Sequence, residues 1–138
     1  MTILLATAAA TLFMTGMGWF VQVVHYPLLG YVGVEAFDRY HQAHSRLTTR
    51  VVVLPMLVEL AGSALLVAEH PPGVRAGLAW AGLALALATW LSTAAIQVPR
   101  HRTLTPDGVT SLVAGTWIRT VAWTAHSGLV LAMLASAH

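Results

Sequence analysis

Four long apolar runs, separated by short polar segments, constrain this chain more than any other feature. Each run is roughly 20 residues long, the length that an α-helix needs to cross the hydrocarbon core of a bilayer. Backbone groups in lipid must find their hydrogen-bond partners within the spanning structure, so such runs predict helices. The runs account for most of the 138 residues and leave no room for a separate soluble domain. The sequence therefore predicts one all-α integral membrane domain over residues 1–138.

The composition agrees with this class and excludes others. Charged residues make up 9% of the chain, whereas a soluble domain carries about a quarter. The net charge of +2 is too small to indicate nucleic acid as a partner. Because the chain has no cysteine, disulfides, thiolate metal sites and cysteine nucleophiles are excluded. The expected partners are the lipid bilayer and a lipophilic small molecule, and assembly into a homo-oligomer stays open.

The breaks between the runs set the expected boundaries. The first span covers about 3–24 and closes at a proline, Pro27, which disfavours helix at the residue before it. The second span covers about 47–68 and the third about 74–97, and the fourth starts near Val113 and continues to the C-terminus. The first run lacks the basic n-region of a signal peptide and is too long for its apolar region. We therefore expect it to be a retained first helix.

The segment 28–50, between the first and second runs, is amphipathic. Its charged and histidine side chains are Glu35, Asp38, Arg39, His41, His44, Arg46 and Arg50. This pattern predicts a connecting helix on the membrane surface that leads into the second span. The expected fold is an antiparallel four-helix bundle with this interfacial helix between its first and second spans.

Antiparallel threading brings polar residues that are far apart in the sequence to one end of the bundle. The end of the first span, the start of the second, the end of the third and the start of the fourth share that end. The residues collected there include His25, His41, His44, Gln97 and His101. Six arginines lie at the same end and one at the other, so the positive-inside rule predicts that this end is cytoplasmic. Both termini would then lie outside, in a bacterial inner membrane.

A histidine-rich set without thiolates is typical of a transition-metal site. His41 and His44 are three residues apart and share one helical face, and His25 and His101 would come from neighbouring spans. Imidazole suits copper and iron, which we expect here in preference to zinc or haem. We predict these four histidines as metal ligands and Gln97 as the residue that orients them. The His-x-x-His pair taken alone is also explained by solvated polarity on a surface helix.

Two further ionisable residues lie deeper in the predicted spans. Glu59 is twelve residues after Leu47, about 18 Å along a helix, and His126 lies at a similar number of residues after Val113. Ionisable groups at such depth usually face the interior of a bundle. We expect Glu59 to pair with His126. The pair could serve catalysis as a proton relay, form a second metal site, or act only in helix packing.

Several short motifs resemble those of known membrane proteins. They are His25-Tyr26-Pro27, Tyr40-His41-x-x-His44, Pro55-Met56-x-x-Glu59 and Gln97-Val98-Pro99-x-His101-x-x-Leu104. In these motifs the chain resembles small bacterial four-helix membrane proteins of uncharacterised function and, distantly, the anthrone-oxygenase-like membrane family. His101 stands where that family tends to carry asparagine, and the His-x-x-His is a further departure. The resemblance implies a four-helix membrane fold and the oxidation of a small hydrophobic aromatic substrate.

The leading interpretation is a membrane metalloprotein, an oxidoreductase or oxygenase that acts on a lipophilic small molecule at a histidine-rich site near one membrane face. A non-catalytic metal- or haem-binding module, or a transporter subunit, is one alternative. A structural or assembly subunit, whose polar groups only fix helix packing, is another. The metal content of the purified protein separates the first interpretation from the last.

Overall fold

The computed structural model describes residues 1–99, 104–105 and 108–137, and this part of the chain is almost entirely helical, without strands. Its elements are α1 (Thr2–Phe20), η1 (Val21–His25), α2 (Tyr26–Leu29), α3 (Val34–Glu69), α4 (Ala76–Ser92), η2 (Thr93–Gln97) and α6 (Val109–Ser136). The two η elements are π-helical turns that continue the helices before them.

Four helical stretches are long and apolar enough to cross a membrane. They are Thr2–Leu29, Val34–Glu69, Ala76–Gln97 and Val109–Ser136. Large apolar side chains are exposed on the outside of the molecule, among them Trp80 at 59%, Leu91 at 67% and Val121 at 61%. Apolar surface of this extent is suited to lipid rather than to water. The prediction of an all-helical chain with four potential spans is confirmed.

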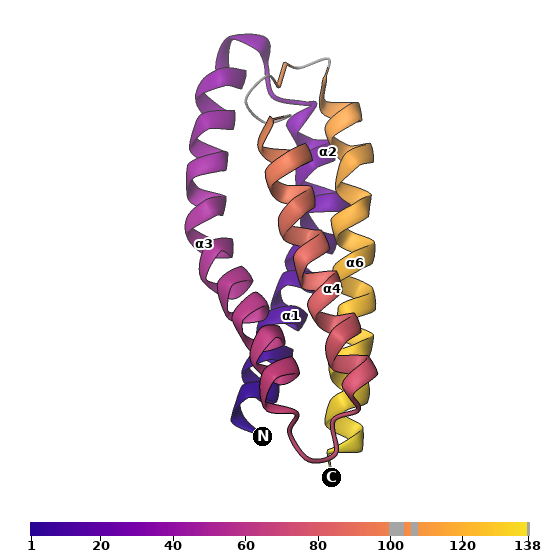
Figure 1. Cartoon of the computed structure of the whole chain (residues 1–138). Coiled ribbons are helices and arrows are strands. Elements are labelled where there is room, and N and C mark those ends of the chain that lie inside the picture. Colours follow the sequence, from indigo (N-terminus) through magenta and orange to yellow (C-terminus); the bar gives the residue numbers. More distant parts are fainter. Residues whose placement is uncertain (100–103, 106–107, 138) are drawn as a thin grey trace.

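The four long helices form one elongated bundle. Consecutive long helices run in opposite directions, and both termini lie at the same end of the molecule (Figure 1). α1 packs against α3 and α6, and α4 packs against the same two helices, which places α3 and α6 on a diagonal. Near the termini the core is formed by Leu4, Leu66, Val67, Ala79 and Met133. At this end the bundle is closed by apolar packing.

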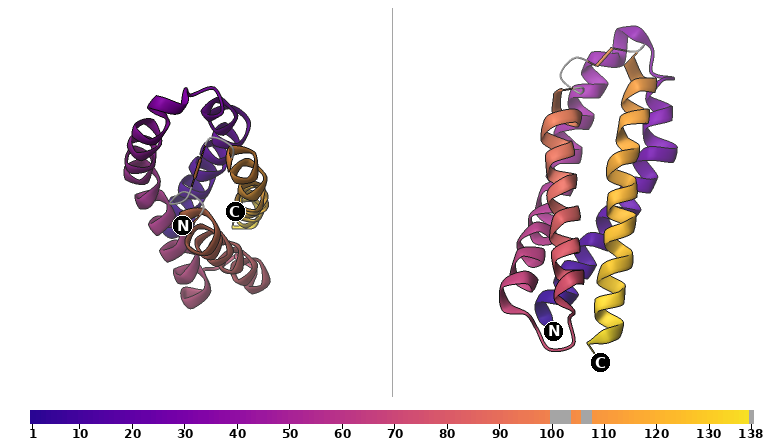
Figure 2. Two further views of the ribbon diagram at one scale, coloured as in Figure 1. Left: turned by 90° about the horizontal axis from the view of Figure 1, so that it is seen from above. Right: turned by 45° about the vertical axis from the view of Figure 1, so that its right-hand side comes forward.

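α3 is a single helix of 36 residues, and it bends. It contains Pro55, which cannot donate a backbone hydrogen bond, and its direction changes partway along its length (Figure 1). Its first half leans away from the other helices, as the view from above also shows (Figure 2). The predicted connecting helix is therefore not a separate element. No glycine or proline lies between Val34 and Leu54, so nothing interrupts the helix.

The first and third spans each pass through a π-helical turn two residues before a proline. The turn Val21–His25 precedes Pro27, and the turn Thr93–Gln97 precedes Pro99. The prediction that Pro27 ends the first helix at Tyr26 is wrong, because the helix continues to Leu29. A π-helical turn shifts the backbone hydrogen-bond register, and the proline is then accommodated at the start of the next helical turn.

Candidate functional site

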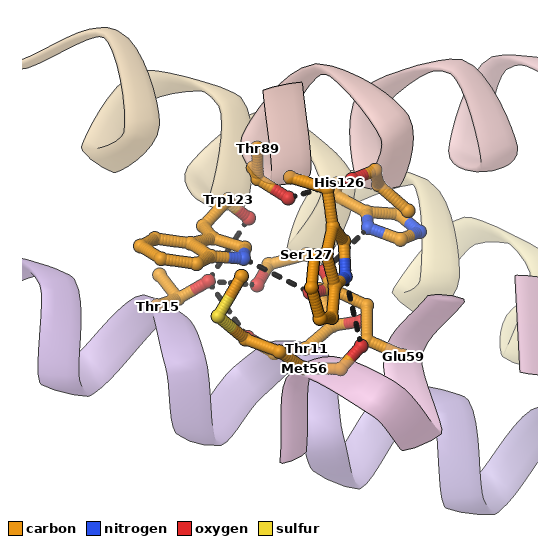
Figure 3. A network of polar contacts seen from close by, with 10 residues as sticks. Thr11, Thr15, Met56, Glu59, Thr89, Trp123, His126 and Ser127 are labelled. Atoms are coloured by element: carbon orange, nitrogen blue, oxygen red, sulfur yellow. Dashed lines mark hydrogen bonds and ion pairs between the residues drawn. The ribbon is translucent and has the colours of Figure 1, made fainter. Parts of the chain in front are cut away.

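Glu59 of α3 and His126 of α6 form a buried pair in the middle of the bundle. Nδ1 of His126 lies 2.7 Å from Oε1 of Glu59, and Nε1 of Trp123 donates to Oε2 of the same carboxylate at 3.0 Å. Glu59 is 0% exposed and His126 is 1% exposed. Figure 3 shows the three side chains converging between α3 and α6. The expected pairing of Glu59 with His126 is confirmed, and Trp123 is a partner that the sequence did not indicate.

Glycines on the neighbouring helices make room for these two rings. A Cβ on Gly18 of α1 would lie 3.2 Å from the Trp123 ring, and a Cβ on Gly82 of α4 would lie 3.1 Å from Nε2 of His126. When Glu59 is ionised it can only accept hydrogen bonds, so His126 carries a hydrogen on Nδ1. Nε2 then faces Gly82. The bundle thus holds both donors of the carboxylate in fixed positions.

Hydroxyl groups extend this network toward α1. Oγ1 of Thr15 lies 2.7 Å from Oγ of Ser127 and 2.9 Å from the carbonyl oxygens of both Trp123 and Thr11, and its one hydrogen can be donated to either carbonyl. Figure 3 places Thr15 and Ser127 beside the Glu59 pair. The centre of the bundle is therefore tied together by polar contacts from α1, α3 and α6.

The histidines near the opposite end from the termini form a second cluster. Nε2 of His25 lies 2.8 Å from Nδ1 of His44, and their ring centroids are 4.4 Å apart. The ring of His41, on the same helix as His44, has its centroid 6.4 Å from that of His44. Oγ1 of Thr48 lies 3.2 Å from Nδ1 of His44. The predicted approach of His25, His41 and His44 is thus observed.

The remaining predicted ligand, His101, lies outside the described residues. Among the residues that are described, no three histidine, cysteine, aspartate or glutamate side chains lie close enough together to hold a metal ion. The nearest approach to such a site is the pair of His25 and His44 with His41 beside it. The four-histidine metal site stays a prediction.

A large cavity adjoins the histidine cluster. Its volume is about 970 Å³, at the upper end of the range for small-molecule sites. His41 and His44 line it near the cluster, and Met14, Met56 and Trp123 line its apolar part. Its walls come from α1, η1, α2, α3, η2 and α6, and the residues that α3 contributes lie between positions 38 and 56. Trp123 therefore connects the cavity to the buried carboxylate of Glu59.

Gln97 contributes to the same cavity from the π-helical turn of the third span. It is 1% exposed, and its Nε2 donates to the carbonyl of Gly115 at 3.1 Å. Gln22, in the other π-helical turn, donates in the same way to the carbonyl of Val113 at 3.0 Å. The Oε1 atoms of both residues are buried and have no partner among the described residues. Gln97 thus lines the cavity, while no contact of its side chain with the three described histidines is seen.

Arg119 also lines the cavity, and the sequence indicated no role for it beyond its positive charge. It lies on α6 one turn before Trp123, with its guanidinium 5.6 Å from the centre of the Trp123 ring. The spacing Arg119, Trp123, His126 follows one face of a helix, which is a signal that could have grouped the three residues. His70 is exposed at the other end of α3, away from both clusters.

Comparison of the chain with protein-family models, with curated proteins and with solved structures finds no match. The resemblance to the anthrone-oxygenase-like family therefore stays a prediction drawn from short motifs. The features that bear on function are the cavity and the two polar clusters near it.

Proposed function

We propose that this chain is an integral membrane protein that holds a lipophilic small molecule in the cavity and oxidises it, with molecular oxygen as the electron acceptor, at a transition-metal site formed by His25, His41 and His44. The main observation that supports this proposal is the cavity. It joins an apolar chamber lined by Met14 and Met56 to a wall that bears imidazoles. A molecule that partitions into lipid would reach such a chamber from the bilayer.

The spacing of the two closest imidazoles supports a shared metal ion. Two nitrogens bound to one ion at about 2.1 Å, with an angle of about 90° to 110°, lie about 3.0 to 3.4 Å apart. The 2.8 Å between Nε2 of His25 and Nδ1 of His44 is within a small side-chain movement of this range. Ligation by His41 as well needs its ring to turn toward His44. His101 is a further candidate, and copper or iron is the metal we propose.

The other polar residues have supporting parts in this proposal. Glu59 and His126 form a buried acid–base pair next to the cavity. The indole N–H of Trp123, a residue of the cavity wall, donates to Glu59 and so connects the pair to the cavity. Gln97, whose Oε1 has no partner among the described residues, is placed to accept a hydrogen bond from the bound molecule. A proton released during oxidation would then have a buried acceptor close by.

We further propose that the bundle threads through the membrane in antiparallel fashion with the histidine end at the cytoplasmic face. The amphipathic first half of α3 would lie at that interface, where Arg39 reaches the lipid headgroups while Arg46 and Arg50 line the cavity. Both termini would lie on the outer side of a bacterial inner membrane. The bilayer is then the main partner, and the exposed apolar faces leave room for a homo-oligomer.

A non-catalytic binding module is a second candidate. It is favoured by the finding that no three potential ligands among the described residues stand close enough for a metal ion. In this case the cavity would bind the lipophilic molecule, and the histidines would contribute only hydrogen bonds to it. Metal loading separates the two candidates.

The proposal is tested by loading the protein, purified in mild detergent, with copper, iron or zinc and measuring the metal retained after a weak chelator. We expect about one equivalent of copper or iron per chain, and less than a tenth in the His25→Ala/His44→Ala variant, because two of its ligands are gone. The matched control His70→Ala removes an exposed imidazole and should retain the wild-type amount. A wild-type protein that retains less than a tenth overturns the metal site. A Soret absorption band would instead assign haem.

A further inference from the structure

Arg119 is a guanidinium in the cavity wall that the proposed chemistry does not use. It lies ten residues after Val109, about 15 Å from the start of α6 along the helix. It is half-buried and lines the cavity with Tyr26 and Trp123. An arginine at such a position within a span is costly and needs a compensating environment.

Three contacts of Arg119 with described residues involve neutral side chains. Nη1 donates to Oγ1 of Thr93 at 3.4 Å, the guanidinium lies over the ring of Trp123, and the Tyr26 side chain is hydrogen-bonded to it. No carboxylate of the described residues lies within ion-pair distance of Arg119, and its Nε is buried without a hydrogen-bond partner among them. Its charge is therefore compensated by aromatic and hydroxyl groups but not by an opposite charge.

Most of the charges of the cavity wall are positive. Among the described residues that line the cavity, Arg46, Arg50 and Arg119 are cationic, and Asp38 is the only carboxylate. This excess of cationic side chains favours an anionic ligand over a neutral one of the same shape. Met14, Met56 and the Trp123 ring offer apolar surface to the rest of that ligand.

We propose that the molecule bound in the cavity carries an ionised acidic group, a carboxylate or a phenolate, and that Arg119 binds it. This inference rests on the proposed function and names the class of its ligand. The guanidinium fork donates two parallel hydrogen bonds to a carboxylate, and Nε is one of the donors that such a pair uses. The apolar part of the ligand lies against the methionines and Trp123. Arg119 is thus a specificity-determining residue of the cavity.

The test compares an acid with its neutral ester. Protein in phosphatidylcholine nanodiscs is titrated with hexadecanoic acid and with methyl hexadecanoate, and the bound ligand is measured by calorimetry. We expect the acid to bind about ten-fold or more tightly than the ester, because a charge-assisted hydrogen bond is lost in the ester. Arg119→Gln should remove this preference by weakening acid binding alone. Arg119→Lys should keep part of it, and Arg75→Gln, a change at the other end of the bundle, should keep all of it.

The outcomes separate this inference from the proposed function. If neither compound binds to the wild-type protein, the binding cavity itself is refuted. If the acid and the ester bind equally well, or if Arg119→Gln keeps the preference, only the acidic ligand is refuted. The comparison of acid and ester in the wild-type protein is decisive even if Arg119→Gln does not fold. A second experiment repeats the titration in nanodiscs that contain phosphatidylglycerol, an anionic lipid. If the acid no longer binds in these nanodiscs, the site binds a lipid headgroup, and the proposal of a small-molecule ligand is overturned.

Discussion

Replacing Glu59 by alanine is expected to destabilise the bundle by about 3 kcal/mol. The carboxylate is fully buried and accepts hydrogen bonds from both Trp123 and His126. Its removal leaves two buried donors without an acceptor, and each such donor costs about 1 to 3 kcal/mol. The free energy of unfolding in mild detergent, followed by helical circular dichroism, measures the loss.

Glu69 provides the matched control because it lies on the same helix and is exposed. Glu69→Ala should change the unfolding free energy by less than about 0.5 kcal/mol. The loss of unfolding free energy in Glu59→Gln should lie between these two values. The amide oxygen of glutamine can accept a hydrogen bond from one of the two donors, but its NH₂ group faces the other donor and cannot accept. Equal stabilities for Glu59→Ala and Glu69→Ala would show that the buried pair does not hold α3 to α6.

Replacing Gly62 by alanine is the second change with a large expected effect. Gly62 is a buried residue of α3, and a Cβ at this position would overlap Oγ1 of Thr7 on α1. Thr7 is 0% exposed, and its hydroxyl donates to the carbonyl of Ile3, so turning the side chain away from residue 62 would break this hydrogen bond. Overpacking of this kind costs about 1 to 3 kcal/mol. Thermal unfolding in detergent should show a clear decrease in Tm.

Two further variants make this prediction specific. Gly16→Ala adds the same methyl group where no atom lies within 4 Å, and it should leave stability unchanged or slightly raised. Thr7→Ala removes the overlapping hydroxyl, and the Cβ of residue 7, 3.2 Å from a Cβ at position 62, then becomes the nearest of the contacts seen with Thr7. The double variant Gly62→Ala/Thr7→Ala should therefore lose less than the sum of its single changes. Simple additivity would contradict the close contact of α1 with α3.

The helices and the depth of the buried pair could be predicted because both depend on the order of residues alone. Apolar runs identify the spans, and a constant rise per residue places Glu59 and His126 at similar depths in different spans. The local effect of Pro27 was predicted wrongly, since the π-helical turn before it depends on backbone hydrogen bonds that no residue pattern specifies. The expected surface helix is part of the continuous helix α3 for a related reason. An amphipathic pattern indicates a helix but does not show where that helix ends.

The cavity could not be predicted from the sequence. It depends on the angle at which α3 leaves the bundle and on the direction in which each side chain points around its helix, and residue counting gives neither. For this reason the sequence did not indicate that the indole N–H of Trp123 donates to Glu59. Arg119 was likewise counted only for its charge, although it lines the cavity.

The meeting of imidazoles from α1 and α3 beside the cavity is tested most directly by cross-linking in membranes. The chain has no cysteine, so the double variant His25→Cys/His44→Cys introduces the only two thiols. We predict that a short bifunctional thiol reagent joins them within one chain in most molecules, as intact mass would show. The pair His25→Cys/His70→Cys, whose second position lies at the far end of α3, should not be joined. Failure of the first pair, or equal joining of both, would contradict the proposed site.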